Sequence, residues 1–259
     1  MSLLERAAES TVSTGGVVAV PVSHAERVRG RVAVLQPYLF PYLGTFQLAR
    51  QVERFICFDD VAFIKKGYIH RNAVLMNGES HAFTAPVKSA SQNRTIVEHE
   101  YVGEWQPLLA LLQRAYAKAP FFEPVFAFVQ RVLLDSDENV ARKNARSMAA
   151  VFDYLGLPFN NGFSSVHALP PELRASDRVR AVCRAEGAST YINPTGGRAL
   201  YDAADFERDG MTLRFCAMRS LQYPQASPAF VPYLSMLDVL MHCSPEKVQE
   251  LLDACDLVA

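Results

Sequence analysis

The sequence has few cysteines and no cysteine spacing typical of a metal site or a redox pair. Its five cysteines, Cys57, Cys183, Cys216, Cys243 and Cys255, are odd in number and widely separated, and no Cys-x-x-Cys occurs. Cys57 and Cys216 stand in apolar runs, which predicts buried core thiols. The pattern argues against a disulfide framework and favours a reducing compartment, so we expect a cytoplasmic protein without a metal site.

Long hydrophobic runs and an excess of one charge are also absent. No apolar run reaches transmembrane length, and Glu5, Arg6 and Glu9 interrupt any secretory-signal pattern near the N-terminus. Lysine and arginine number 26 and aspartate and glutamate 27, so the net charge is −1. We therefore expect neither DNA binding nor membrane insertion.

The composition that remains is typical of a soluble globular protein. Of 259 residues, 50% are hydrophobic and 20% are charged, which suffices for one large core or for a domain with a smaller companion. Residues 1–30 are expected to form a partly ordered extension. Residues 31–259 are expected to form one folded domain.

Apolar runs that alternate with helical patterns predict an α/β fold. Residues 31–36 and 54–58 are predicted strands on either side of a helix at about 44–52, a unit that favours a parallel strand pair. Asn77-Gly78 predicts a hairpin between residues 73–76 and 81–84. Further strands are predicted at 94–102, 189–193 and 211–216.

The middle of the chain is predicted to be helical. Apolar residues at three- and four-residue spacing predict helices at 105–117, 121–134 and 138–155, and later helices are predicted at 172–186 and 245–255. We expect a Rossmann-like, mostly parallel sheet flanked by helices, with a helical subdomain at about 104–160.

Three helix starts are predicted from capping residues. Asp137 is expected to cap the helix at 138–155, and Ser176 the helix at 172–186. Ser235 is expected to cap a later helix, with Asp238 as the acidic partner of a capping box.

The stretch from Leu35 to Gln47 is the strongest candidate for a site. It reads LQPYLFPYLGTFQ and places polar and aromatic residues between a predicted strand and a predicted helix, where open α/β sheets bind ligands. Gln36, Tyr38 and Tyr42 are predicted to bind a substrate by hydrogen bonds and stacking. The alternative is a packed turn, in which the prolines restrict φ and the rings fill the core.

Two acidic residues end the second predicted strand. Asp59 and Asp60 are expected to point to opposite faces, so one of them should face the site. That carboxylate is predicted to act as a general base or to bind a substrate ammonium group. The alternative is an aspartate that caps a turn, and the sequence leaves open which of the two faces the site.

Basic and amide side chains follow before the hairpin. Arg71 and Asn72 are predicted to bind an anion, with Lys65 beside them, although Lys65 and Lys66 also fit solvated surface charges. His70 is a candidate acid–base group, with a structural or exposed histidine as the alternative.

Further candidates lie in the second half of the chain. Ser165 is predicted to bind a ligand or to cap a turn, because no Gly-x-Ser-x-Gly elbow of a hydrolase surrounds it. Arg178 is predicted to face a phosphate. Tyr223 and Gln225 lie in the segment YPQASP, which is predicted to close over a pocket as a lid.

Together these motifs resemble the WbqC-like proteins, bacterial proteins associated with gene clusters for O-antigen and related glycans or metabolites. The resemblance is carried by Gln36 to Gly44, Asp59-Asp60-Val61, Asn72, Pro86-Val87, Ser164-Ser165, Tyr201-Asp202, Tyr223-Pro224-Gln225, Phe230 to Ser235 and Asp238. The departures are Ala62, where the family usually has glutamine, His70, where it usually has asparagine, and Asn193 to Gly197 in place of a Ser-Gly element.

A second resemblance concerns the turn alone. Phe40 to Thr45 is similar to the His-x-Gly-His region of nucleotidylyltransferases and pantothenate-synthetase-like ligases. Tyr42 and Thr45 stand where that motif has its histidines, which stabilise charge on the α-phosphate. Their absence argues against straightforward nucleotidyl transfer.

The WbqC-like resemblance implies a bacterial enzyme of O-antigen or natural-product biosynthesis. We expect a transferase that forms an amide by moving an acyl or aminoacyl group onto a small-molecule amine, such as a nucleotide-linked amino sugar. The donor is left open among a carrier-protein thioester, an acyl-CoA, an aminoacyl-tRNA and an ATP-derived adenylate. The alternatives are an ATP- or CTP-dependent ligase or nucleotidyltransferase-like enzyme, and a non-catalytic nucleotide-sugar-binding protein.

Overall fold

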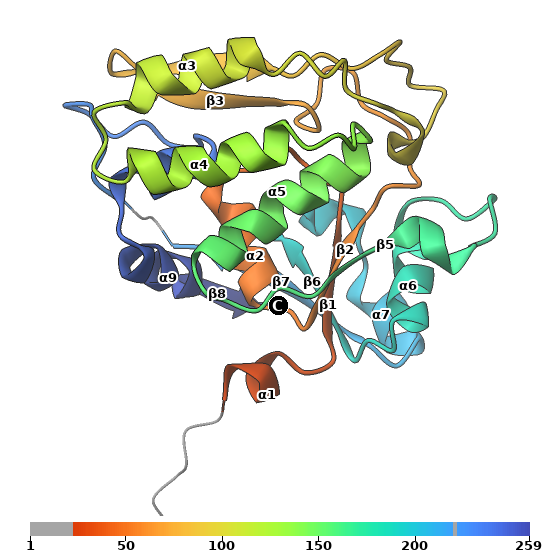
Figure 1. Ribbon diagram of the computed structural model, residues 1–259. Coiled ribbons are helices and arrows are strands. Elements are labelled where there is room, and N and C mark those ends of the chain that lie inside the picture. The colour runs from red at the N-terminus through yellow and green to blue at the C-terminus, as the bar shows by residue number, and fades with distance from the viewer. Residues whose placement is uncertain (1–22, 220–221) are drawn as a thin grey trace, which may run out of the picture.

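Residues 23–219 and 222–259, which the computed structural model describes, fold around a six-stranded, mostly parallel sheet (Figure 1). The strands lie in the order β5-β2-β1-β6-β7-β8, and β7 pairs with β8 in the antiparallel direction. Their bounds are β1 Arg31–Leu35, β2 Arg54–Cys57, β5 Asn161–Phe163, β6 Thr190–Pro194, β7 Thr212–Met218 and β8 Cys255–Val258. The predicted α/β fold with a mostly parallel sheet is confirmed.

Strand β1 lies at the centre of the sheet. Val32 pairs with Arg54 of β2 on one side and with Tyr191 of β6 on the other. The chain leaves β1 through α2 (Leu43–Arg50) to reach β2, whereas β6 and β7 extend the sheet in the opposite direction. The strand order therefore reverses beside β1, which is where open α/β sheets bind ligands at their carboxyl edge.

Both faces of the sheet are covered, as a parallel sheet requires. Val32 and Val34 of β1 belong to a buried cluster with Val182 of α6 (Ala175–Ala185) and Phe206 of α7 (Ala203–Arg208). Ala33, which points to the other face, belongs to the larger cluster formed with α2, α5 (Val140–Tyr154) and α9 (Pro245–Asp253). The alternation of side chains along β1 thus separates the two layers of helices.

The middle of the chain packs over the second face. It contains the hairpin β3 (Arg71–Met76) and β4 (Glu79–Thr84), then α3 (Gln106–Tyr116) and α4 (Phe122–Leu133), which lie together in the upper part of Figure 1. Buried residues of these elements belong to the same cluster as Ala33 of the sheet. Helix α8 (Met236–His242) contacts both β3 and α4. The separate helical subdomain at 104–160 stays a prediction.

Most predicted elements are observed within a few residues of their expected bounds, but the predicted strand at 94–102 is wrong. Ile96–Glu98 form a 3₁₀ helix. The Glu98 carboxylate accepts hydrogen bonds of 2.7 Å from both the backbone N–H and the hydroxyl of Thr95. This capping box closes a tight turn where an extended strand was expected.

Two of the predicted helix caps are also wrong. Helix α5 is capped by Asn139, whose side chain accepts from the Arg142 N–H at 3.1 Å, while Asp137 accepts from the Asn139 N–H and pairs with Arg142. Arg174 precedes α6, so Ser176 lies inside the first turn. A carboxylate or hydroxyl near a helix start thus gives the approximate start but not the capping position.

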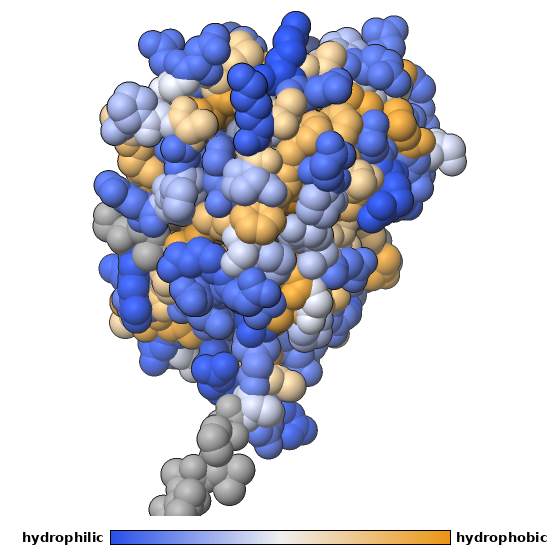
Figure 2. Space-filling view, turned by 60° about the vertical axis from the view of Figure 1, so that its left-hand side comes forward, coloured by the Kyte–Doolittle hydropathy of each residue, from blue (hydrophilic) through white to orange (hydrophobic). Residues whose placement is uncertain are grey.

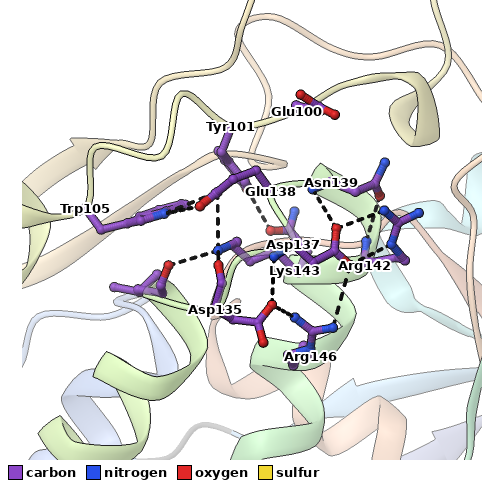
Figure 3. A network of polar contacts seen from close by, with 12 residues as sticks. Glu100, Tyr101, Trp105, Asp135, Asp137, Glu138, Asn139, Arg142, Lys143 and Arg146 are labelled. Carbon is purple, nitrogen blue, oxygen red and sulfur yellow. Dashed lines mark hydrogen bonds and ion pairs between the residues drawn. The ribbon is translucent and has the colours of Figure 1, made fainter.

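A buried lysine closes the turn between α4 and α5 (Figure 3). The Nζ atom of Lys143 donates to the carbonyl oxygens of Leu133 and Asp135 at 2.9 Å each and lies 3.2 Å from the Glu138 carboxylate. The same Nζ lies 4.9 Å from the centre of the Trp105 ring. Burial lowers the pKa of Lys143, but carbonyl and carboxylate oxygens surround the ammonium group, so we assign it a structural role.

The N-terminal extension lies largely outside the described residues, which begin at Ser23. His24–Val28 form the short helix α1, capped by Ser23. In the described ranges, no helix is both long and apolar enough to cross a membrane. On the face drawn in Figure 2, hydrophilic side chains surround scattered hydrophobic ones. Two large exposed side chains, Tyr68 and Tyr233, recur in the site described below.

Candidate functional site

A cavity of about 560 Å³ lies at the carboxyl ends of β1 and β2. Gln36 follows β1, and Phe58 and Asp60 follow β2, so the sheet places all three at one edge. The opposite wall comes from the N-terminal end of α6, and a third wall from the segment 92–95 before the 3₁₀ helix. We call this cavity the arginine cleft, after its lining residues Arg94, Arg174 and Arg178.

The arginine cleft carries an excess of positive charge. Arg178 forms an ion pair with Asp60, whereas Arg94 and Arg174 donate to backbone carbonyls and form no ion pair with any residue in the described ranges. Three guanidinium groups against one carboxylate leave a net charge of +2 among the lining residues. Helix α6 begins at Ala175 in the same wall, and its first N–H groups add to the positive potential. The cleft is therefore built to attract an anion.

The two adjacent aspartates have different surroundings. Asp59 is buried, and its carboxylate accepts from the Ser165 N–H at 3.0 Å, the Ser165 hydroxyl at 2.8 Å and the Ser164 hydroxyl at 3.1 Å. Asp60 lines the arginine cleft, where it meets Arg178 and lies 2.5 Å from the same Ser164 hydroxyl. Asp59 thus joins the end of β2 to the turn after β5, and Asp60 is the carboxylate that a ligand in the cleft would meet.

A second cavity, of about 240 Å³, lies beside the turn that follows β1. We call it the tyrosine cleft, because Tyr38, Tyr42, Tyr68 and Tyr233 line it together with Pro41 and Asn72. The Tyr38 hydroxyl donates to the Gln36 side-chain oxygen at 3.4 Å, and Gln36 also lines the arginine cleft. This contact joins one lining residue of each cavity.

The chain matches the family model of the WbqC-like protein family over residues 36–250. It belongs to that family. An uncharacterized protein of Mycobacterium tuberculosis, Rv1507c, is 22% identical over 221 residues, which cover 83% of this chain and 95% of that protein. No solved structure matches the chain. The WbqC-like match includes residues of both clefts, from Gln36 to Tyr233.

The turn of this WbqC-like chain is fixed by side chains from distant elements. Phe40 has a φ of 43°, an unfavourable value for a residue with a large side chain. Its carbonyl accepts from the Asn72 amide at 2.6 Å and from the Ser235 hydroxyl at 2.7 Å, and its N–H donates to the Ser147 hydroxyl at 3.0 Å. These bonds hold Tyr42 at the start of α2. Asn72, predicted to bind an anion, thus supports the turn while its side chain lines the tyrosine cleft.

The other residues predicted for anion binding lie apart from the arginine cleft. Lys65, Lys66 and Arg71 are exposed, and Arg71 donates to the carbonyl of Lys66 at 3.3 Å. None of the three lines either cleft. Their participation in substrate binding stays a prediction.

His70 lies in the core near the tyrosine cleft but does not line it. Its ring packs against Phe63, with 5.2 Å between the ring centres, and Nδ1 is buried without a hydrogen-bond partner in the described part of the chain. Burial, with smaller contributions from Arg71 and His99, lowers the pKa of His70. Burial therefore disfavours the protonated ring, and the role of His70 as an acid–base group stays a prediction.

The predicted lid segment is bonded to the core through Asp238. The Asp238 carboxylate is buried and accepts from the hydroxyl of Tyr223 at 2.8 Å and from the amide of Gln225 at 2.9 Å. It does not form the predicted capping box, although Ser235 does cap α8 by accepting from the Leu237 N–H. Tyr223 lines a further cavity of about 400 Å³, whose lining also includes Tyr42 and Tyr233.

Sequence reasoning missed Arg94, Arg174, Tyr68 and Tyr233. Arg94 stood in a segment predicted as a strand, and Arg174 lies in a loop whose position depends on tertiary contacts. Tyr233 belongs to the family motif but was not named as a site residue. An aromatic residue after a glycine in a charged segment, as in Lys65-Lys66-Gly67-Tyr68, was the available signal. The described residues contain no group of three or more His, Cys, Asp or Glu placed to hold a metal ion.

Proposed function

We propose that this WbqC-like protein is a cytoplasmic biosynthetic enzyme that transfers an acyl or aminoacyl group to the amine of a nucleotide-linked amino sugar. The observation that carries this proposal is the arginine cleft, which is lined by one carboxylate, Asp60, paired with Arg178, and by two arginines that form no ion pair with any described residue. A nucleotide-linked amino sugar has both complementary features, because its diphosphate is anionic and its sugar carries an amine.

The diphosphate is assigned to Arg94 and Arg174. Both arginines have their charge available for a ligand, since they donate only part of their N–H groups, to backbone carbonyls. Arginine presents a planar fork that binds phosphate oxygens in pairs, and the start of α6 adds backbone N–H groups.

The amine is assigned to Asp60. A carboxylate at this position binds the ammonium form of the acceptor and takes one proton from it. The neutral amine then attacks the acyl carbonyl, and its second proton passes to the donor's leaving group as that group departs. The new bond joins the amine nitrogen to the acyl carbon, and the bond to the donor's leaving group breaks. The remainder of the acceptor site is assigned to Gln36, which lines the arginine cleft, and to Tyr38 and Tyr42, which line the tyrosine cleft.

The test combines binding with product formation. We expect inorganic diphosphate and a UDP-linked amino sugar to raise the melting temperature, and Arg174→Gln to weaken diphosphate binding about tenfold or more. Arg114→Gln is the charge-matched control, since Arg114 is exposed on α3 and does not line the cleft. Incubation of the amino sugar with thioester, CoA, aminoacyl-tRNA or ATP-dependent donors should give an amide by mass spectrometry.

Several results would contradict the proposal. Release of pyrophosphate from ATP or CTP without transfer would indicate the ligase or nucleotidyltransferase class. Binding of the nucleotide sugar without product from any donor would indicate a binding protein. Diphosphate binding that is equal in wild type and Arg174→Gln would remove the arginine cleft from the acceptor site.

A further inference from the structure

We infer that the tyrosine cleft binds the base of the nucleotide whose phosphates occupy the arginine cleft. This inference rests on the proposed function and deepens it by assigning the nucleoside end of the acceptor to Tyr68 and Tyr233. Among the described residues, four tyrosines, one proline and one asparagine line the cavity of about 240 Å³, and no charged side chain lines it. The lining therefore suits a flat, uncharged ring.

The polar groups of this lining are mostly hydroxyls. The Asn72 amide is already engaged, since it donates to the carbonyl of Phe40 and accepts from the N–H of Ala73 at 2.9 Å. Phenol hydroxyls both donate and accept, so they bond to several kinds of base edge without strong selection. Stacking on aromatic faces is equally tolerant of the identity of the base. We thus expect a site that accepts more than one base.

Two of the rings are placed to cover a ligand. Tyr68 is 73% exposed and Tyr233 is 76% exposed, the largest values among the large hydrophobic side chains of the described residues. They come from different parts of the chain, Tyr68 from the segment before β3 and Tyr233 from the segment before α8, and both line the cleft. A flat ring bound there would remove their faces from water.

The backbone at Tyr233 is held in an unfavourable conformation. Its φ is 60°, in the left-handed region that a bulky aromatic residue rarely adopts. The flanking contacts impose this conformation: Ser235 bridges to Tyr42, and its hydroxyl donates to the carbonyl of Phe40. The ring of Tyr233 consequently meets that of Tyr42 edge to face, with 6.2 Å between the ring centres. Strain of this kind is expected where an aromatic ring must be aimed at a ligand.

The relation between the clefts matches the layout of a nucleotide. Gln36 lines the arginine cleft and accepts from the Tyr38 hydroxyl of the tyrosine cleft at 3.4 Å. A nucleoside diphosphate carries its charge at one end and its flat, uncharged ring at the other. Phosphates at Arg174 and a base at Tyr68 would therefore place the ribose beside Gln36.

The test compares ligands that differ by the base alone. Calorimetry with ribose 5-phosphate, UMP and AMP should show that both nucleotides bind on the order of tenfold more tightly than the sugar phosphate. Tyr68→Leu and Tyr233→Leu should abolish that ratio, whereas Tyr68→Phe should retain it. Both side chains are largely exposed, so their replacement removes little buried area, and Leu134→Ala serves as an exposed control at the end of α4.

Inorganic diphosphate separates this inference from the proposed function. We expect its affinity to be unchanged in the tyrosine variants and weakened in Arg174→Gln. A wild-type protein that binds UMP, AMP and ribose 5-phosphate equally overturns the inference, even when diphosphate binds. A base-dependent ratio that survives in both leucine variants also overturns it. Failure of diphosphate to bind contradicts the proposed function instead. The effect of the base is then measured by comparing the affinities of uridine and adenosine with that of ribose.

Discussion

The hydroxyl of Tyr116 on α3 donates a hydrogen bond of 2.9 Å to the carboxylate of Asp238 on α8. Both residues are buried, and the other carboxylate oxygen accepts from Tyr223 and Gln225. The Asp238 carboxylate thus joins α3 and α8 to the segment that contains Tyr223 and Gln225, and Tyr223 lines the cavity of about 400 Å³. Burial, followed by the charge of Asp238, raises the pKa of Tyr116, so the phenol stays a donor over the whole physiological range.

Removal of this carboxylate should destabilise the protein. In Asp238→Ala, the buried Tyr116 hydroxyl and the half-buried Tyr223 and Gln225 lose this acceptor, and we expect the free energy of unfolding to fall by about 2–5 kcal/mol in urea denaturation. Asp253→Ala is the matched control, because Asp253 is exposed and its ion pair with Arg50 lies at the surface. That variant should lose less than about 1 kcal/mol. Equal losses in both variants would contradict the structural role of Asp238.

Gly44 lies in the first turn of α2, against the side chains of Met218 and Tyr42. A Cβ atom at Gly44 would lie 2.2 Å from the Met218 sulfur and 2.5 Å from the Tyr42 ring. We expect Gly44→Ala to lower the free energy of unfolding by about 1–3 kcal/mol through overpacking. The control Gly196→Ala adds a Cβ that meets nothing within 4 Å. A thermal-denaturation curve for Gly44→Ala that matches that of Gly196→Ala would show that Met218 and Tyr42 move aside without cost.

Acid should destabilise the protein through His70. Its pKa in the folded protein is lowered mainly by burial, so between that value and about 6.5 the unfolded chain binds a proton that the folded protein does not. The free energy of unfolding therefore falls as the pH falls through this interval, by at most about 1.4 kcal/mol per pH unit for one proton.

The matched variant removes the titration but keeps the shape. His70→Phe retains a ring against Phe63 and sacrifices no hydrogen bond at Nδ1. Urea denaturation at pH 7.5 and pH 5 should show a smaller loss of stability for His70→Phe than for wild type. His81→Gln, at an exposed site on β4, should leave the loss unchanged. A His70→Phe protein with the wild-type pH dependence would assign the acid sensitivity to other groups.

Apolar periodicity predicts those strands and helices whose own residue spacing already determines which face is buried. Strand β1 and helix α2 carry their apolar residues at strand and helix spacing, and both were predicted from that spacing. Strands β5 and β8 were missed because they are short and have no clear alternation; β5 exists through pairing of Asn161 to Phe163 with β2. Propensity alone could not indicate this, because the partner strand lies more than a hundred residues earlier.

The candidate site shows the same limit. The end of β1 was predicted from its polar turn, and Gln36, Tyr38 and Tyr42 do line cavities there. The sequence could not decide between Asp59 and Asp60, because that depends on the position of the Ser164 turn after β5. Arg174 reaches the cleft only through the packing of α6 against the sheet, which no local motif encodes.

Asp59 and Asp60 should respond differently to the same substitution. The Asp59 carboxylate accepts three hydrogen bonds, whereas in Asp59→Asn the amide NH2 group faces a donor and cannot accept from it. We therefore expect the free energy of unfolding to fall by about 1–3 kcal/mol. Asp60→Asn can still accept through its oxygen and should change stability less. Thermal denaturation of the two variants, with Asp153→Asn on the surface of α5 as control, measures this difference.

In binding measurements, we expect Asp60→Asn to have the larger effect and Asp59→Asn the smaller one, the reverse of their effects on stability. Asp60→Asn removes the one carboxylate of the arginine cleft, which raises the net charge of its lining from +2 to +3. Inorganic diphosphate should therefore bind more tightly to Asp60→Asn than to wild type, most clearly at low ionic strength. The preference for a UDP-linked amino sugar over the matching UDP-linked sugar with a hydroxyl group should disappear, since no carboxylate remains to bind the ammonium group.

Asp59→Asn should retain both wild-type behaviours in its folded fraction. If Asp60→Asn keeps the preference for the amine, the acceptor nitrogen lies elsewhere, and Asp60 serves only to position Arg178.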